Sequence, residues 1–115
     1  MKIVVNKKYG GFGLSDKAIE LYAKLAGLQL EQRTYEEEHA FSNWKFWVDI
    51  IKDRVFSVYE LNRTDPNLVA VVEQLQDAAN TNFSQLEVVE IPDNVEWSIT
   101  ERDGFEIIEE KHRTW

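Results

Sequence analysis

Hydrophobic residues recur with two different spacings in the first part of the chain, and their order predicts a strand followed by a helix. The short apolar run at 3–5 is typical of a buried strand over 2–6. Ser15 or Asp16 is a suitable helix N-cap and Gly27 a suitable C-terminal stop. Between them, apolar residues recur at the spacing of one helix face: Ala18, Ile19, Tyr22, Leu25 and Ala26. The chain therefore begins with a strand, a loop and a helix.

A second helix is predicted in the middle of the chain. Asp65 suits the N-cap position, and Pro66 suits the first helical position, where a missing N–H is tolerated. An apolar stripe at helical spacing follows: Leu68, Val69, Val71, Val72, Leu75 and Ala79. The sequence Asn-Thr-Asn at 80–82 ends the helix. Before the helix, the alternation over 54–61 predicts a strand.

Three further strands are predicted after the second helix. Apolar residues alternate over 86–91, and Pro92 stops that strand. The segments 96–101 and 105–111 flank the turn 102–104, whose Asp-Gly pair is a strong hairpin signal between apolar runs. We therefore expect a C-terminal β-hairpin.

The segment 28–54 has the least regular pattern, and we expect it to be a variable insertion within a single domain that spans 1–115. A chain of 115 residues is long enough for one hydrophobic core. The order of the other elements predicts the α+β class, an α/β sandwich. We expect a small mixed sheet with the two main helices packed on it.

Composition narrows the possible functions. The formal net charge of -8 disfavours generic nucleic-acid binding. The sequence contains no cysteine, and its two histidines, His39 and His112, are isolated, so we expect no disulfide, no metal site and no other cofactor. It contains no long apolar run and no signal-like start. We therefore expect a soluble intracellular protein that does not bind membranes.

The loop between the first strand and the first helix has the composition of an anion-binding site. Gly10, Gly11 and Gly13 allow close backbone approach, and two lysines precede them. Ser15 stands at the helix N-terminus, where free N–H groups carry partial positive charge. Phe12 is either a plug beneath the helix or an exposed platform for stacking. The pattern matches neither the P-loop nor the dinucleotide fingerprint, and an ordinary tight turn is the alternative.

Two other places offer groups that suit an anionic ligand. The chain ends in KHRTW, where Arg113 can hold a phosphate with a bidentate fork and Trp115 can stack on a base. Arg63, just before the second helix, is another candidate for neutralising the charge of an anionic ligand. Each has a plainer interpretation. Trp115 covers the end of the core, and Arg113 faces solvent or pairs with Glu109 or Glu110. Arg63 is an exposed loop charge or clamps loop carbonyls.

Several motifs together resemble a family of small proteins from tailed bacteriophages and prophages. They lie at both ends and in the middle of the chain, as KIVVN, YGGFGLS, RxDPxLV, VVEIPDxVxW, DGF and EKHRTW. The resemblance leaves 28–54 unmatched. It implies an origin and not an activity, because the family is known mainly as proteins of unassigned function. Phage proteins of this size include sponges that sequester the nucleotide signals of bacterial defence systems, which is an analogy.

We therefore expect a phage-encoded, non-catalytic protein that sequesters a small anionic ligand of the nucleotide type in the cytoplasm of the infected host. In this hypothesis, backbone amides of 10–13 and the helix N-terminus at Ser15 hold phosphate. Arg63 and Arg113 neutralise its charge, and Phe12 or Trp115 stacks on the base.

Two alternative functions remain open. A phosphodiesterase-like enzyme needs a nucleophile and a base, and His112 is the one candidate base beside carboxylates that caps and turns already explain. An acidic inhibitor of a host protein is the other alternative. The aromatic cluster of Trp44, Phe46 and Trp47 either covers the core or forms an interface, and we expect a homodimer or a larger symmetric oligomer.

Overall fold

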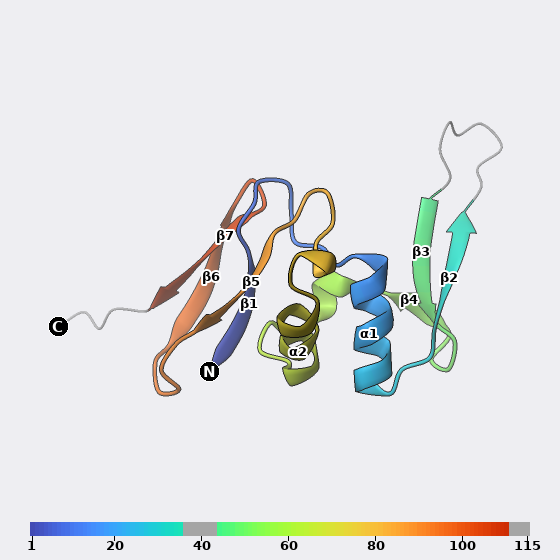
Figure 1. Ribbon diagram of the computed structural model, residues 1–115, viewed down its shortest axis with the longest axis horizontal. Coiled ribbons are helices and arrows are strands. Elements are labelled where there is room, and N and C mark those ends of the chain that lie inside the picture. Colours follow the sequence, from blue (N-terminus) through green and yellow to red (C-terminus); the bar gives the residue numbers. More distant parts are fainter. Residues whose placement is uncertain (36–43, 111–115) are drawn as a thin grey trace.

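The computed structural model describes residues 1–35 and 44–110 (Figure 1). Its elements follow in chain order: β1 (Lys2–Asn6), α1 (Asp16–Ala26), β2 (Leu30–Tyr35), β3 (Trp44–Asp49), β4 (Arg54–Phe56), the 3-10 turn η1 (Val58–Glu60), α2 (Pro66–Leu75), the 3-10 turn η2 (Gln76–Ala79), β5 (Leu86–Glu90), β6 (Trp97–Arg102) and β7 (Phe105–Glu110). This is the predicted α+β class, and β6 and β7 form the predicted C-terminal hairpin.

Both main helices begin at the predicted caps. The Ser15 hydroxyl accepts a hydrogen bond from the Ala18 backbone N–H at 3.1 Å, and Gly27 ends α1 in the left-handed conformation. At α2, the Asp65 carboxylate accepts the backbone N–H of Asn67 at 2.8 Å, and Pro66 is the first helical residue. Local capping chemistry therefore sets where these helices begin.

The strands form three small antiparallel ladders in place of one mixed sheet. Among the described residues, β1 pairs with β5, β6 pairs with β7, and β2, β3 and β4 form a three-stranded sheet. Short connections join neighbouring strands in two of these ladders, and short connections permit only antiparallel pairing. The strand expected over 54–61 is shorter than predicted, because the Ser57 hydroxyl accepts the Tyr59 N–H at 3.3 Å and starts η1.

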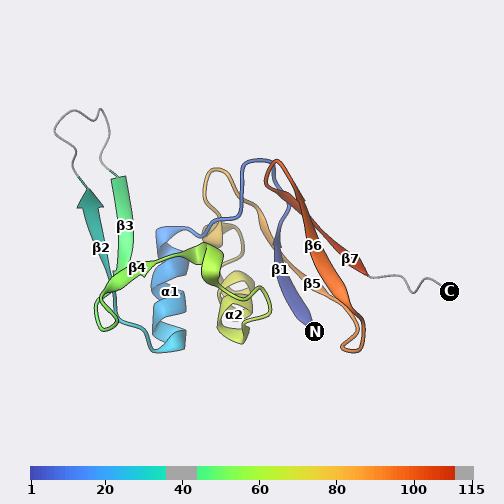
Figure 2. The same cartoon turned by 180° about the vertical axis from the view of Figure 1, so that it is seen from behind.

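The segment 28–54 contributes to the described fold. It contains β2 and β3, and Trp47 packs against the core while its indole N–H donates to the Asp16 carboxylate at 3.3 Å. The described parts of the chain thus form successive layers: the β2-β3-β4 sheet, the helices α1 and α2, the β1-β5 pair, and the β6-β7 hairpin (Figures 1 and 2).

The strand β1 lies between α2 and the hairpin, so its two faces are both covered (Figures 1 and 2). Ile3, Val4, Val5 and Asn6 are all fully buried. The main core cluster draws side chains from β1, the glycine loop, both helices, η2 and β5: Val4, Phe12, Leu14, Ala18, Ile19, Tyr22, Leu68, Val69, Val71, Val72, Ala79 and Leu86. Because Asn6 is polar and fully buried, it needs hydrogen-bond partners within the fold.

The turn of the hairpin touches the glycine loop, and this contact predicts the effect of a single methyl group. A Cβ on Gly104 would overlap the backbone nitrogen of Gly11 and lie 2.7 Å from the carbonyl carbon of Gly10, and Gly104 has φ +88°. We expect Gly104→Ala to lower the free energy of unfolding by at least about 3 kcal/mol, because strain and overlap add. Gly27→Ala is the matched control, since Gly27 has φ +71° and no atom lies within 4 Å of the position that a Cβ would take.

The control should lose about 1–2 kcal/mol, the cost of left-handed backbone alone. Urea denaturation followed by circular dichroism measures both values. Equal losses in Gly104→Ala and Gly27→Ala would contradict the close approach of the turn to the loop.

A hydrogen bond between the helices predicts how stability changes with pH. The Tyr22 hydroxyl donates to the Asp65 carboxylate at 2.6 Å. Burial raises the pKa of Tyr22 well above its ordinary value, and the hydrogen bond and charge of Asp65 raise it further. The folded state therefore keeps this proton where the unfolded chain releases it, so the stabilisation is complete below about pH 10 and falls above it.

We expect the advantage in unfolding free energy of the unmodified protein over Tyr22→Phe to shrink above about pH 10, by up to about 1.4 kcal/mol per pH unit. Urea denaturation at several pH values measures this difference. If the difference in unfolding free energy between the two proteins stays constant above about pH 10, Tyr22 has the same pKa in the folded and unfolded states, which would contradict this prediction.

Candidate functional site

A buried ion pair lies beneath the glycine loop and joins three parts of the chain. The guanidinium of Arg63 donates to the two carboxylate oxygens of Glu106 at 2.6 and 2.8 Å. It also donates to the Val4 carbonyl at 3.2 Å, and the Arg63 carbonyl accepts the Val4 N–H at 2.9 Å. Glu106 accepts a further hydrogen bond from the Asn6 backbone at 2.8 Å. The pair thus fastens β7 and the loop before α2 to β1.

The side chain of Asn6 connects the same region to two more segments. Its amide nitrogen donates to the carbonyls of Lys8 and Gly104 at 2.9 and 2.7 Å. Its amide oxygen accepts the backbone N–H of Gln85 at 2.8 Å. Among the described residues, no buried side-chain nitrogen or oxygen lacks a hydrogen-bond partner. The polar groups under the loop therefore satisfy one another.

Phe12 is a plug and not a platform. Its ring is 5% exposed and belongs to the core cluster. The guanidinium carbon of Arg63 lies 3.6 Å from the centre of this ring, so the ring and the ion pair pack directly on each other. Of the two alternatives that the sequence left open, the structure shows the buried one.

The glycines of the loop allow close approach by other parts of the same chain. A Cβ on Gly10 would lie 2.8 Å from the Phe83 carbonyl oxygen, and one on Gly13 would lie 3.2 Å from a methyl carbon of Thr81. The N–H of Gly10 donates to the Asp103 carbonyl at 2.9 Å. The chain itself thus occupies much of the space that the glycines leave open.

The remaining predicted site residues divide into two groups. Ser15 caps α1, and its hydroxyl also donates to the Ala78 carbonyl at 2.6 Å, which places η2 against this helix end. Arg113 and Trp115 lie outside the described residues, as does His112. The structure therefore brings Phe12, Arg63 and the glycines together, and their contacts there are contacts within the fold.

The outer face of the same loop carries exposed aromatic rings. Tyr9 is 66% exposed and Phe83 is 68% exposed, although both are large and apolar. The rings of Tyr9 and Phe105 lie 5.3 Å apart, centre to centre. Phe83 approaches the loop at Gly10, since its Cβ is 3.1 Å from the position that a Cβ on Gly10 would take. The segments that carry Tyr9, Phe83 and Phe105 therefore meet at the glycine loop.

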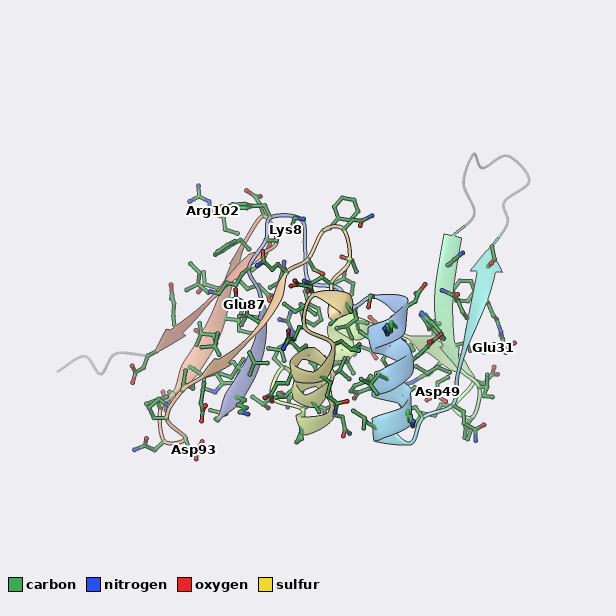
Figure 3. The ribbon with its side chains drawn as sticks, viewed as in Figure 1. Lys8, Glu31, Asp49, Glu87, Asp93 and Arg102 are labelled. Atoms are coloured by element: carbon green, nitrogen blue, oxygen red, sulfur yellow. The ribbon has the colours of Figure 1, made fainter. Side chains whose placement is uncertain are left out.

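Three basic residues belong to the same segments as these rings. The ammonium of Lys7 lies 5.4 Å from the centre of the Phe105 ring, and that of Lys8 donates to the Asn82 carbonyl at 3.0 Å. Arg102 pairs with Phe105 at the end of the hairpin, and Lys8 and Arg102 lie at the same end of the molecule (Figure 3). We call Lys7, Lys8, Tyr9, Phe83, Arg102 and Phe105 the loop-tip patch.

The aromatic members of the loop-tip patch are functional candidates that the sequence prediction missed. Tyr9 stands directly before the first loop glycine, and its neighbours Lys7 and Lys8 supplied the only signal. Phe83 and Phe105 are far away in the sequence, so no local pattern connects them to the loop. The contact of two turns with one loop brings them together.

Further observations concern metal binding, membrane crossing and similarity to known proteins. In 1–35 and 44–110, no group of three or more metal-ligating side chains is arranged to hold a metal ion. No helix in these ranges is long and apolar enough to cross a membrane. No protein-family model, curated protein or solved structure matches this chain.

The buried ion pair predicts a large and coupled loss of stability. The side chains of Arg63 and Glu106 are 18% and 7% exposed. We expect Arg63→Met to cost about 3–5 kcal/mol, because it leaves the Glu106 carboxylate buried without its cation. The double variant Arg63→Met/Glu106→Gln should lose less than the sum of the two single losses, by about 0.5–3 kcal/mol.

Urea denaturation of the four proteins in this cycle measures the coupling. Glutamine at 106 keeps an acceptor for the Asn6 N–H, which makes it the conservative partner. A loss below about 1 kcal/mol for Arg63→Met, the value typical of an exposed pair, would contradict the clamp.

Proposed function

We propose that this protein binds a small nucleotide-type anion at the loop-tip patch and does not transform it. The observation that carries the proposal is the combination of exposed aromatic rings and cations in one place. Tyr9 and Phe83 offer flat, exposed faces, and base stacking on such faces contributes about 1–3 kcal/mol per base. Lys7, Lys8 and Arg102 supply positive charge beside them. Stacking with charge neutralisation is how proteins bind flat anionic ligands.

The charge distribution supports a small ligand over a long polymer. The chain as a whole has a formal net charge of -8, which repels an extended polyanion. The loop-tip patch has three cations, and two acidic residues stand at the adjoining turn: Asp103, and Glu101, whose carboxylate accepts a hydrogen bond from the Gly104 N–H. A mononucleotide or dinucleotide engages the patch without crossing the acidic remainder of the surface.

The buried groups have a supporting role in this proposal. Asn6, Arg63 and Glu106 fix the relative positions of the glycine loop and the hairpin that present the rings. Preorganised side chains lose less conformational entropy on binding than mobile ones. The site predicted from the loop amides is thus shifted to the loop's outer side chains. Arg113 and Trp115 stay predictions for additional contacts.

The biological role that we propose is sequestration. Binding without turnover removes a signal stoichiometrically, which needs a dissociation constant on the order of nanomolar to low micromolar. The resemblance to small phage proteins makes an anti-defence role in the host cytoplasm the corresponding proposal. A symmetric oligomer would enlarge the binding surface, and it remains part of the same proposal.

Nucleotide affinity of single variants tests this proposal. We expect Tyr9→Ala and Phe83→Ala each to weaken binding by roughly 5- to 150-fold, the loss of about 1–3 kcal/mol of stacking. Tyr59→Ala is the matched control, because Tyr59 is an equally exposed aromatic residue, 75% exposed, on η1. Calorimetric titration with mononucleotides, cyclic dinucleotides and inorganic phosphate measures the affinities, and chromatography of each bound ligand detects any turnover.

The second part of this test measures how the nucleotide affinity depends on salt concentration and on the charge of the lysines. Lys7→Gln/Lys8→Gln should weaken binding and flatten its dependence on salt, because fewer counterions are exchanged. Deletion of 111–115 tests the contribution predicted for Arg113 and Trp115. The proposal would be contradicted if none of the nucleotides bound, or if Tyr9→Ala and Tyr59→Ala lost the same amount of affinity. If the ligand is recovered in chemically altered form, the protein is an enzyme and the proposal of binding without turnover is wrong.

A further inference from the structure

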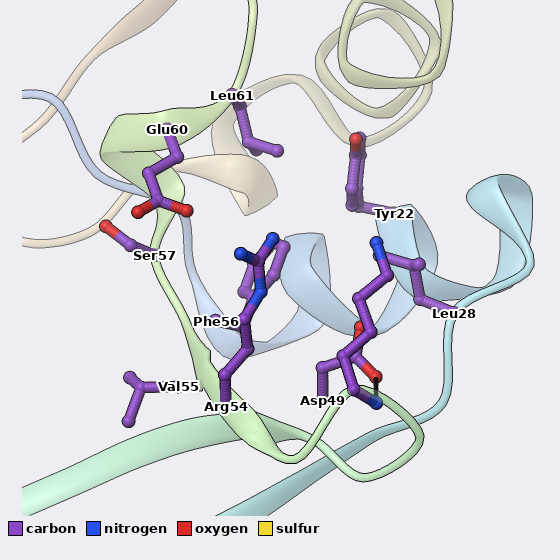
Figure 4. Close-up of a pocket in the computed structure, with 10 residues that line it drawn as sticks. Tyr22, Leu28, Asp49, Arg54, Val55, Phe56, Ser57, Glu60 and Leu61 are labelled. Atoms are coloured by element: carbon purple, nitrogen blue, oxygen red, sulfur yellow. Dashed lines mark hydrogen bonds between the residues drawn. The ribbon is translucent and has the colours of Figure 1, made fainter.

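A separate pocket lies on the other side of α1, where the β2-β3-β4 sheet meets η1 (Figure 4). Its volume is about 230 Å³, which is below the roughly 300–1,000 Å³ of pockets that hold drug-sized ligands. The lining residues come from α1 and the chain that follows it, the end of β3 and the turn after it, β4, and η1 with its flanking residues: Tyr22, Leu28, Asp49, Lys52, Arg54, Val55, Phe56, Ser57, Glu60 and Leu61. The loop-tip patch contributes none of them.

One part of the lining is apolar and partly buried. Leu28, Phe56 and Leu61 pack against the hydrophobic core. The rings of Phe56 and Tyr22 lie 6.0 Å apart, centre to centre, so the aromatic surface is continuous. This surface suits a small aliphatic or aromatic group.

The other part of the lining carries both signs of charge. Lys52 and Arg54 are exposed cations, and Asp49 and Glu60 are carboxylates. Within the described residues, none of Lys52, Arg54 and Glu60 forms an ion pair. Asp49 is buried, and one of its oxygens accepts the backbone N–H groups of Ile51 and Lys52 at 3.1 and 3.0 Å. Its carboxylate is thus held in place at the pocket wall.

We propose that this pocket binds a zwitterion with an apolar side chain, which is the chemistry of a free α-amino acid. A simple anion would face the carboxylates of Asp49 and Glu60, and a simple cation would face Lys52 and Arg54. A zwitterion satisfies both signs at once. Its apolar group occupies the surface of Phe56 and its neighbours, where burial is favourable.

The geometry assigns a role to each charged residue. The guanidinium of Arg54 and the carboxylate of Glu60 both lie at the pocket, on β4 and η1 (Figure 4). Arg54 has the planar fork that pairs with a carboxylate in two parallel hydrogen bonds, and Lys52 adds positive charge. The carboxylate of Glu60 accepts hydrogen bonds from the ammonium group of the ligand. The buried carboxylate of Asp49 keeps a fixed negative charge in the wall of the pocket.

A matched set of three small molecules tests the proposal. L-leucine carries both charges, 4-methylpentanoate lacks the ammonium, and 3-methylbutylamine lacks the carboxylate. We expect L-leucine, or L-phenylalanine in a parallel set with 3-phenylpropanoate and phenethylamine, to bind at least about tenfold more tightly than either partial analogue. Chemical-shift changes in 15N-labelled full-length protein measure the affinities and show whether the shifts fall at 49–61.

Variants separate the two charge contacts. Arg54→Gln should weaken amino-acid binding by at least about tenfold, and Glu60→Gln should remove the preference over 4-methylpentanoate. Arg33→Gln is the control, because Arg33 is an exposed arginine on β2 that does not line the pocket. Equal binding of the three molecules, shifts outside the pocket, or no binding by either set would overturn the proposal. Tyr9→Ala should leave this binding unchanged, which separates it from nucleotide binding.

Discussion

The buried contact between Arg63 and Glu106 is the interaction on which the arrangement of the other elements depends. It joins the segment before α2 to the final strand, across the first strand, and these three segments are distant in sequence. Glu106 accepts hydrogen bonds from the Asn6 backbone as well as from Arg63, so its buried charge is fully used. The hairpin therefore covers β1 in one defined position, and the glycine loop is held above it.

This arrangement changes the meaning of the glycine loop. Three glycines before a helix suggest a cradle for phosphate, yet Gly10 and Gly13 lie close to Phe83 and Thr81. The glycines let turns of the same chain approach, and that approach brings Phe83 against the loop at Gly10. A buried framework and an exposed aromatic face therefore arise from the same few residues. The inner face stabilises the fold, and the outer face is free to contact a ligand.

The sequence predicts the features that depend on local chemistry. Ser15, Gly27, Asp65 and Pro66 define helix ends through bonds to residues nearby, and the Asp-Gly turn defines the hairpin. Features that depend on distant partners escape local patterns. The sequence predicted that Arg63 binds the ligand and left a clamp on loop carbonyls as one alternative. The structure shows Arg63 hydrogen-bonded to the Val4 carbonyl and to Glu106, 43 residues further on. The described parts of the irregular segment 28–54 form paired strands, and Trp47 of β3 donates a hydrogen bond to Asp16 of α1, which no periodicity within the segment reveals.

The central claim is that the loop binds through its outer face while its inner face holds the fold. Titration of 15N-labelled protein with adenosine monophosphate, followed by NMR, tests this most directly. Our account predicts shift changes at 7–9, 82–83 and 102–105, with the side-chain resonance of the Arg63 guanidinium unchanged. A shifted Arg63 resonance together with unshifted resonances at Tyr9 and Phe83 would contradict it, because the ligand would then occupy the interior of the loop.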